Sequence, residues 1–433
     1  MTNRKQNLKL LLASATLLLL LSPYLQGRFH LLPDHPLGGF VAAGEQPVLD
    51  WEQWRAGEYQ SLCDSFLNNS IGLRGHLVRL HNQVQWDLFR RHNTRRVVVG
   101  KEDYLFEVPY LNSYLGRDYM GEHVMEEKAR AYKEVQDTLA AKGVDFMVVI
   151  APSKVAYFPE YIPEEWEPGK KGPSHYDYLA RRLPELGVNV VDVDAWFREM
   201  KGEAEYPLFP KSGIHWSFYG AYRAADSLLR KMERERGCPM PEMALDSMVV
   251  SEQNWLADYD VGRSLNLYRH TNVYPMGYPV FHYAPKPGQR KPKTLVVGDS
   301  FYFLLKDLQF HQIGLGGGHF WYYNRDVTAF PWSPYKQVED LDVASTILEH
   351  EQVIVLATAA NLYGAPWGFD EEVLRVFGSR LEQRMEYYLH KMRQSPEWMA
   401  SIAAKAVEQK IELEKMIRLD AEWLARRDLA GEW

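Results

Sequence analysis

Continuous apolar runs alternate with amphipathic segments along the middle of this 433-residue chain. The apolar runs, with the polar turns that end them, occupy residues 144–154, 188–193, 293–300 and 351–358. Apolar residues recur at helical spacing at residues 126–143, around 176–186 and at 218–235. Strands that are apolar on both faces and separated by helices are typical of a parallel sheet covered by helices on both sides. We therefore predict an α/β fold of three layers around a mostly parallel sheet.

Polar residues follow three of these predicted strands. They are the Pro-Ser-Lys turn at residues 152–154, the Asp-Ser pair at 299–300, and Thr358 with Asn361. In open α/β sheets, ligands bind outside the carboxyl ends of the strands. We therefore expect the functional site at this edge of the sheet.

The Gly-Asp-Ser triplet at residues 298–300 has two interpretations. Each of its residue types suits a tight turn. Alternatively, Ser300 is a nucleophile, which needs a base to accept its proton at neutral pH. His215 is the best candidate for that base, because it lies in a glycine-containing turn just ahead of the helix that begins near Phe218. We predict Ser300 as nucleophile and His215 as base.

The group that orients the histidine is less clear from the sequence. A catalytic imidazole is normally oriented by a carboxylate or a carbonyl on its other nitrogen. Asp299 adjoins the serine, but neighbouring strand residues face opposite ways, so we expect it to brace the turn. Asp258 and Asp260 lie in a predicted loop and could reach the histidine, and solvated loop acids are the alternative. We select Asp260 as the third catalytic residue.

Other residues near strand ends could complete a cleft. Lys154 and Asn324 are candidate donors to an oxyanion, beside the backbone N–H of Ser300. Flat aromatic side chains also line carbohydrate clefts, and the candidates here are Trp216, Tyr322 and Tyr323. Packing in the core is the alternative for all three aromatic residues.

The N-terminus has the character of a secretory segment. Three basic residues precede an apolar run at residues 10–25, and no clear Ala-x-Ala cleavage site follows. This pattern predicts a membrane anchor, with a cleaved signal peptide as the alternative. Positively charged residues beside a membrane segment stay on the cytoplasmic side. Both the anchor and the signal peptide therefore place the rest of the chain across the membrane. We expect an exported protein.

We expect four segments along the chain. Residues 1–27 form the signal anchor or signal peptide, and residues 28–95 form a linker and an N-terminal helical segment. Residues 96–370 hold the α/β domain. Residues 371–433 form a charged helical extension that packs on this domain or on a partner.

Composition excludes several classes of function. A net charge of −7 and the lack of a Lys/Arg tract argue against nucleic-acid binding. A zinc site from His215, His311 and His319 lacks any metal-ligand spacing, so we expect no metal and no cofactor. Two cysteines are too few for a disulfide scaffold, although Cys63 and Cys238 could form one bridge.

Four motifs occur together in order along the chain. They are GKEDYLFE at residues 100–107, APSK at 151–154, HWS at 215–217 and GDSF at 298–301. The set resembles the AlgX/AlgJ-type alginate O-acetyltransferases, which are exported, SGNH-hydrolase-like proteins that acetylate exopolysaccharides. The likeness spans roughly residues 40 to 370.

This resemblance implies an SGNH-hydrolase-like fold with Ser300 as the nucleophile and His215 as the base. It also implies a polysaccharide substrate, a membrane-bound O-acyltransferase as acetyl donor, and a place in the cell envelope or at the periplasmic face of the inner membrane. The chain departs from the family at Gly213, where the family often carries the aspartate of an Asp-x-His-Trp motif. Asp260, another acid or a backbone carbonyl would then orient His215.

The sequence therefore predicts an acyltransferase that moves an acetyl group through an acetyl-serine onto polysaccharide hydroxyls. Two alternatives remain. One is a carbohydrate acetylesterase that uses the same serine and histidine. The other is a non-catalytic glycan-binding subunit of an exopolysaccharide modification complex, which the glycine at residue 213 makes plausible.

Overall fold

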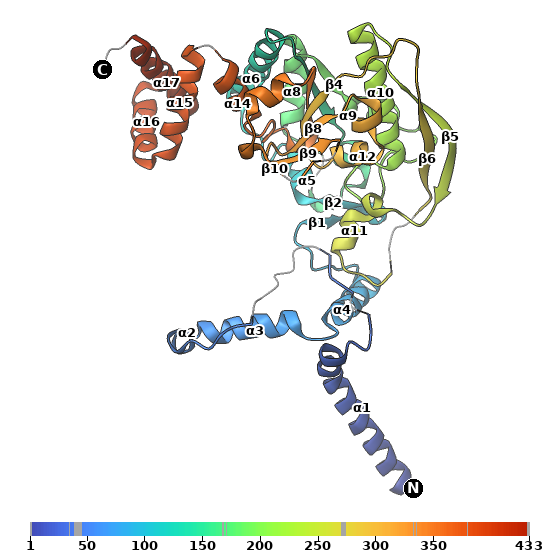
Figure 1. Ribbon diagram of the computed structural model, residues 1–433. Helices are drawn as coiled ribbons and strands as arrows, with labels where there is room; N and C mark the ends of the chain where they lie inside the picture. The colour runs from blue at the N-terminus through green and yellow to red at the C-terminus, as the bar shows by residue number, and fades with distance from the viewer. Residues whose placement is uncertain are drawn as a thin grey trace. The chain divides into compact units, whose positions relative to one another are not determined.

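Figure 1 shows the computed structural model of the chain. The structure describes residues 2–33, 35–38, 46–166, 169, 171–269, 274–331, 333–334, 336–378 and 380–430. The chain divides into two compact units. The smaller comprises Met1–Val97 and Tyr259–Val273, and the larger comprises Val98–Asp258 and Tyr274–Trp433.

A seven-stranded sheet forms the centre of the larger unit. Its strands are β3 (Asp145–Ala151), β4 (Val190–Asp192), β7 (Thr294–Gly298), β8 (Gly318–Tyr322), β9 (Asp326–Phe330), β10 (Lys336–Gln337) and β11 (Gln352–Thr358). Their order is β10-β9-β8-β7-β11-β3-β4. The strands from β8 to β4 run parallel, whereas β9 and β10 add antiparallel pairs at one edge. The predicted α/β fold with a mostly parallel sheet is confirmed.

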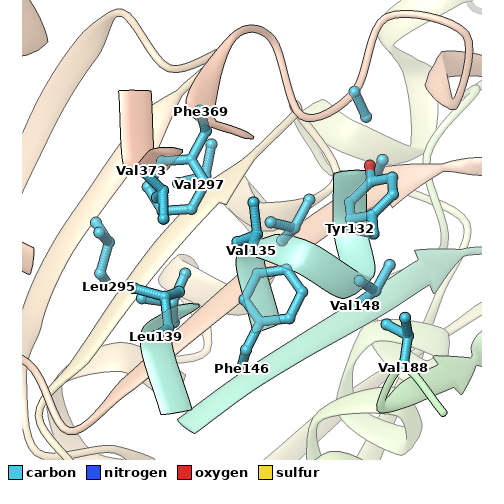
Figure 2. Close-up of a cluster of buried hydrophobic side chains, with 14 of the residues drawn as sticks. Tyr132, Val135, Leu139, Phe146, Val148, Val188, Leu295, Val297, Phe369 and Val373 are labelled. Carbon is cyan, nitrogen blue, oxygen red and sulfur yellow. The ribbon is translucent and has the colours of Figure 1, made fainter. Parts of the chain in front are cut away.

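One face of this sheet carries a large apolar core. The helices that contribute to it are α6 (Glu122–Ala140), α8 (His175–Glu185), α13 (Val343–Leu348) and α14 (Phe369–Phe377). Val148 of β3 lies in the same cluster as Val135 and Leu139 of α6 (Figure 2). Met147 and Val149 alternate with these core residues along β3 and are also fully buried. Burial of both faces explains why the sequence of this strand is continuously apolar.

Helices α9 (Val193–Glu199), α10 (Phe218–Arg236) and α12 (Tyr302–Asp307) lie on the other side of the sheet (Figure 1). Local sequence sets the ends of α10. The Ser217 hydroxyl accepts a hydrogen bond from the backbone N–H of Gly220 at 2.9 Å, and Gly237 ends the helix with a φ of 60°. The start of α10 fixes the position of the residues just before it, which include His215.

Two further pairs of strands flank the sheet. The first pair is β1 (Val97–Val99) and β2 (Leu105–Glu107), joined by a turn at residues 100–103. The second pair is the long antiparallel ribbon of β5 (Glu242–Ser251) and β6 (Met276–Ala284), which was not predicted from the sequence. Phe281 of β6 packs against Tyr222 of α10, with ring centroids 5.2 Å apart. This ribbon therefore contacts α10 on the same side of the sheet as the histidine turn.

The smaller unit contains α1 (Thr2–Phe29), α2 (Trp51–Ala56), α3 (Glu58–Ser70), α4 (Arg74–Phe89) and α11 (Asp260–Ser264). Within α1, Lys9–Phe29 is long and apolar enough to cross a membrane by length and composition. The Asn82 amide of α4 donates to the carbonyl of Leu265 at 2.9 Å, which links the two parts of the unit. Cys63 and Cys238 are free thiols.

Three helices follow the sheet near the C-terminus: α15 (Arg380–Gln394), α16 (Pro396–Gln409) and α17 (Leu413–Ala430). They share an apolar cluster that includes Met392, Ile402 and Ile417. Ser395 caps α16, since its hydroxyl accepts from the backbone N–H of Trp398. Helix α14 belongs instead to the core beside the sheet. The helical extension therefore has a small core of its own.

Candidate active site

Ser300 lies at the carboxyl end of β7, in the tight turn that leads into α12. Gly298 ends the strand where the backbone of β11 approaches closely, because a Cβ on Gly298 would lie 2.9 Å from the carbonyl oxygen of Leu356. The Ser300 carbonyl accepts from the N–H of Phe303 at 3.1 Å. Ser300 itself is only partly buried. The turn therefore presents the serine at the edge where sites of α/β proteins occur.

The imidazole of His215 contacts this serine. Its Nε2 atom lies 2.8 Å from the Oγ atom of Ser300, which is hydrogen-bond distance for a general base and its nucleophile. The ring packs against Phe301, with centroids 4.9 Å apart. The structure thus brings together the two residues that the sequence analysis paired across 85 positions of the chain.

Asp299 braces the serine turn, as expected. One carboxylate oxygen accepts from the N–H of Phe301 at 3.0 Å. The other accepts from the backbone N–H of Thr358 and from the side-chain amide of Asn361, both at 2.8 Å. Asp299 is fully buried, and burial raises the pKa of its carboxyl while these three hydrogen bonds oppose the shift. The carboxylate ties the end of β7 to the end of β11.

Asn361 is a site residue that the sequence analysis did not select. It was noted only as part of a polar strand end, and nothing in the local sequence indicates a partner 62 residues away. Its amide donates to Asp299, the residue before Ser300, so Asn361 lies next to the serine turn. Asn361 is therefore a candidate donor in the cleft.

The backbone N–H of Ser300 is a second candidate donor. Among the residues that the structure describes, this N–H has no hydrogen-bond partner. A free backbone N–H on the nucleophile is a usual element of an oxyanion hole. This observation supports the donor proposed from the sequence.

Lys154 has a different environment from the one expected of an oxyanion donor. Its ammonium group is fully buried and donates to the carbonyls of Leu105 at 2.8 Å, Lys211 at 2.6 Å and Gly213 at 2.8 Å. These bonds fix the turn that ends two residues before His215. The geometry favours a positioning role for Lys154.

Packing explains the glycine at residue 213. A Cβ there would lie 2.5 Å from the carbonyl oxygen of Ala257 and 2.7 Å from Pro210. The backbone at residues 257–258 therefore occupies the space that an aspartate side chain would need. Asp258 is buried, and one of its oxygens accepts from the hydroxyl of Tyr278 at 2.6 Å.

Asp260 lies at the start of α11 in the smaller unit. One of its carboxylate oxygens accepts from the N–H of Val261 at 2.6 Å. Its assignment as the acid that orients His215 stays a prediction.

The three aromatic residues predicted to contact sugar have different environments in the structure. Trp216 is fully buried and packs against Phe301 and Phe197, with centroids 5.5 and 6.2 Å away. Its ring packs in the core next to the histidine turn and cannot stack on a sugar. The prediction that Trp216 contacts the sugar is therefore wrong. Tyr322 and Tyr323 are partly exposed at the end of β8. The N–H of Tyr323 donates to the carbonyl of Gly298 at 2.9 Å, which places these tyrosines beside the serine turn.

Asn324, a predicted oxyanion donor, and His311, considered as a zinc ligand, have other partners in the structure. The amide of Asn324 donates to the carbonyl of Trp367 at 3.2 Å, so this amide holds a neighbouring turn. His311 is buried, with its ring nitrogens 2.6 Å from the hydroxyl of Tyr302 and 3.0 Å from the carbonyl of Thr294. In the described ranges, no group of three or more His, Cys, Asp or Glu side chains could hold a metal ion.

Comparison with known proteins matches residues 97–311 to the family model "SGNH hydrolase-like domain, acetyltransferase AlgX". This range includes both His215 and Ser300. The domain of this chain is therefore an SGNH-hydrolase-like domain. This part of the chain belongs to the AlgX/AlgJ family of SGNH hydrolase-like acetyltransferases.

Two curated relatives are probable alginate O-acetylases AlgJ. The chain is 23% identical to the Pseudomonas aeruginosa protein over 222 residues, which cover 51% of this chain and 52% of that protein. It is 25% identical to the Pseudomonas putida protein over 139 residues, which cover 32% and 34%. The chain thus matches about half or less of the length of these relatives.

Solved structures give similar matches at low identity. The O-acetyltransferase domain of Pseudomonas putida AlgJ matches with a TM-score of 0.42 and 16% identity, covering 65% of this chain and 99% of that chain. Pseudomonas aeruginosa AlgX matches with a TM-score of 0.40 and 17% identity, covering 63% and 69%.

Proposed function

We propose that this protein transfers acetyl groups onto hydroxyls of an exported polysaccharide through an acetyl-Ser300 intermediate. The 2.8 Å contact between His215 Nε2 and Ser300 Oγ is the observation that carries this proposal. The family model supports the reaction class, because it describes an acetyltransferase.

In the first step, His215 Nε2 takes the hydroxyl proton of Ser300 while Oγ attacks the carbonyl carbon of an acetyl ester. The carbonyl oxygen becomes an oxyanion, which the N–H of Ser300 stabilises, with the Asn361 amide as a second candidate donor. The tetrahedral intermediate then collapses. The bond to the leaving oxygen breaks, this oxygen takes the proton from His215, and Ser300 is left acetylated.

The second step reverses the roles. A sugar hydroxyl gives its proton to His215 Nε2 and attacks the acetyl carbon. When this second tetrahedral intermediate collapses, the bond to Ser300 Oγ breaks and His215 returns the proton to Oγ. The product is an O-acetylated sugar, and the enzyme regains its starting protonation state.

Other residues position this pair. Asp299 holds the serine turn, and Lys154 holds the turn before the histidine. We assign Asp260 as the acid that stabilises the protonated form of His215. Tyr322 and Tyr323 offer partly exposed rings on which an acceptor sugar can lie.

The acetyl donor and the location follow from the same proposal. An exported enzyme has no access to cytoplasmic acetyl-CoA, so a membrane-bound O-acyltransferase partner would supply acetyl groups across the bilayer. Helix α1, which has the length and composition of a membrane span, would keep the enzyme beside that partner.

A turnover assay separates this function from its two rivals. With p-nitrophenyl acetate as donor, we expect an oligosaccharide acceptor to accelerate turnover and to become acetylated. Turnover that is indifferent to sugar would indicate an acetylesterase. Unchanged acetylation of polysaccharide in cells that carry only Ser300→Ala would indicate a non-catalytic subunit.

A further inference from the structure

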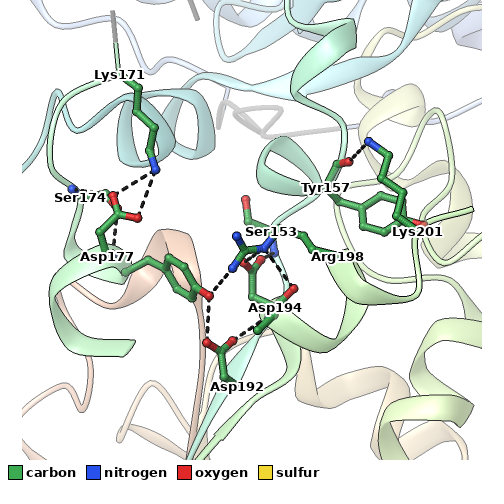
Figure 3. Close-up of polar contacts among 11 residues, drawn as sticks. Ser153, Tyr157, Lys171, Ser174, Asp177, Asp192, Asp194, Arg198 and Lys201 are labelled. Atoms are coloured by element: carbon green, nitrogen blue, oxygen red, sulfur yellow. Dashed lines mark hydrogen bonds and ion pairs between the residues drawn. The ribbon is translucent and has the colours of Figure 1, made fainter. Parts of the chain in front are cut away.

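A polar cavity of about 120 Å³ lies at the carboxyl ends of β3 and β4. Figure 3 shows the polar residues around it, which include Ser153, Asp194 and Arg198. One wall comes from the short helix η8 (Ala359–Asn361), through Ala359 and Ala360.

This cavity neighbours the serine turn. The amide of Asn361, the last residue of η8, donates to Asp299 at 2.8 Å, so η8 contacts both the cavity and the turn. In the sheet, β7 and β3 lie on either side of β11. Since neighbouring strands are about 4.8 Å apart, the ends of β7 and β3 are separated by roughly 10 Å. A ligand that spans roughly 10 Å along this edge from Ser300 would bring its far end to the strand that borders the cavity.

Three hydroxyl groups in the cavity wall are available to a ligand. They belong to Ser113 of α5 (Val108–Leu115), Tyr114 of the same helix and Ser153. Within the described part of the chain, none of these hydroxyls has a hydrogen-bond partner. Ser113 and Ser153 are only 3% and 4% exposed, and a buried hydroxyl is costly unless a ligand or water satisfies it.

The charged groups around the cavity are already paired. Arg198 Nε lies 3.0 Å from Asp194 Oδ2, and the Arg198 guanidinium also contacts the hydroxyl of Tyr176. Lys171 Nζ lies 3.0 Å from Asp177 Oδ2. Two cations therefore face two carboxylates, which leaves no positive charge uncompensated for an anionic ligand. The rings of Tyr114 and Tyr176 are themselves in contact with Lys171 and Arg198, at 5.1 and 5.2 Å from the ring centroids. The unbonded hydroxyls suit a neutral, hydroxyl-rich ligand instead.

We propose that this cavity binds one neutral sugar residue of the acceptor polysaccharide, next to the residue that Ser300 acetylates. The proposal rests on the proposed function of Ser300. Pockets for drug-sized ligands measure about 300–1,000 Å³, so this cavity of about 120 Å³ can take no more than part of one sugar residue, with its hydroxyl groups. The inference adds a specificity element, because it selects neutral sugars over uronates at this position.

Calorimetric titration of the full chain carrying Ser300→Ala tests the proposal without any chemistry. The ligands are a β-linked glucose trisaccharide and a mannuronate trisaccharide. We expect the glucose trisaccharide to bind more tightly, and Tyr114→Ala to weaken it about tenfold through loss of the ring and its hydroxyl. Tyr114→Phe, which keeps the ring, should weaken it by less. Tyr387→Ala, on the exposed face of α15, is the control and should leave binding unchanged.

Three results would overturn the proposal: no binding of either sugar, equal affinity in Tyr114→Ala and the parent, or tighter binding of mannuronate. Acetylation of Ser300 by p-nitrophenyl acetate is then measured in the wild type and in Tyr387→Ala with the serine intact. The two rates should agree within about twofold, because Tyr387 lies on the exposed face of α15. Loss of acetylation in the wild type would contradict the proposed function but not sugar binding, so the two failures are distinguishable.

Discussion

A Cβ atom on Gly213 would lie 2.5 Å from the carbonyl oxygen of Ala257. The family often carries the aspartate of its Asp-x-His-Trp motif at this position. In this chain, the backbone at residues 257–258 fills the space that an aspartate side chain at residue 213 would need. Restoring the family residue by itself should therefore damage this protein.

We expect Gly213→Asp to lower the free energy of unfolding by about 1–3 kcal/mol and to slow acetylation of Ser300, because the new side chain must displace backbone next to the histidine turn. Thermal unfolding and the acetylation rate measure the two effects. Gly169→Asp is the matched control, since a Cβ at Gly169 meets no atom within 4 Å. Faster acetylation in Gly213→Asp would show that the turn can accept the family's acid.

Lys154→Met should destabilise the protein by about 2–4 kcal/mol. The change leaves the carbonyls of Leu105, Lys211 and Gly213 without the ammonium that satisfies them. Acetylation of Ser300 should fall as well, because the turn before His215 loses its support. Urea denaturation and acetylation kinetics test this, with the exposed Lys336→Met as control. A variant of normal stability that fails only in acetylation would instead support the oxyanion role first predicted for Lys154.

Asp260→Asn should slow acetylation of Ser300 by about 100-fold or more, as loss of the orienting acid does in other serine enzymes. Asp258→Asn is the matched comparison, because Asp258 is already committed to the hydroxyl of Tyr278. We expect it to retain most of the rate. The opposite ranking would assign the orienting role to Asp258, and full rates in both would point to a backbone carbonyl.

Burial raises the pKa of the Asp194 carboxyl to about 6 from an ordinary value of 3.8. Between these values the folded state binds more protons than the unfolded state, so the free energy of unfolding falls as pH rises from about 4 to 6. This group should contribute roughly 2–3 kcal/mol to that fall. Urea denaturation of wild type and Asp194→Asn at pH 4 and pH 7 measures it. Equal pH dependence in both proteins would contradict the assignment.

The sheet was predictable because its central strands carry a simple signal. Continuous apolar runs such as residues 146–151 are buried on both faces, and polar residues mark where each strand ends. The β5–β6 ribbon was not predicted. Exposed Val249 and Val250 sit side by side on β5, so burial does not alternate along this strand in the way that marks a half-buried strand.

The pairing of Ser300 with His215 could be predicted from residue chemistry. The residues that hold these two side chains in position could not. Lys154 donates to three backbone carbonyls, and no side-chain pattern encodes such partners. The contact of Asn361 with Asp299 joins the ends of two neighbouring strands and depends on their order in the sheet. For Trp216 the sequence suggested a role in the cleft that the structure does not support. A tryptophan beside a catalytic residue can face either the core or the cleft, and the sequence does not distinguish the two.

Intact mass spectrometry of the full chain after incubation with p-nitrophenyl acetate tests the central claim most directly. We predict a single acetyl adduct on the wild type that maps to Ser300 and is absent from Ser300→Ala and His215→Ala. An adduct unaffected by Ser300→Ala, or no adduct on the wild type, would contradict the account.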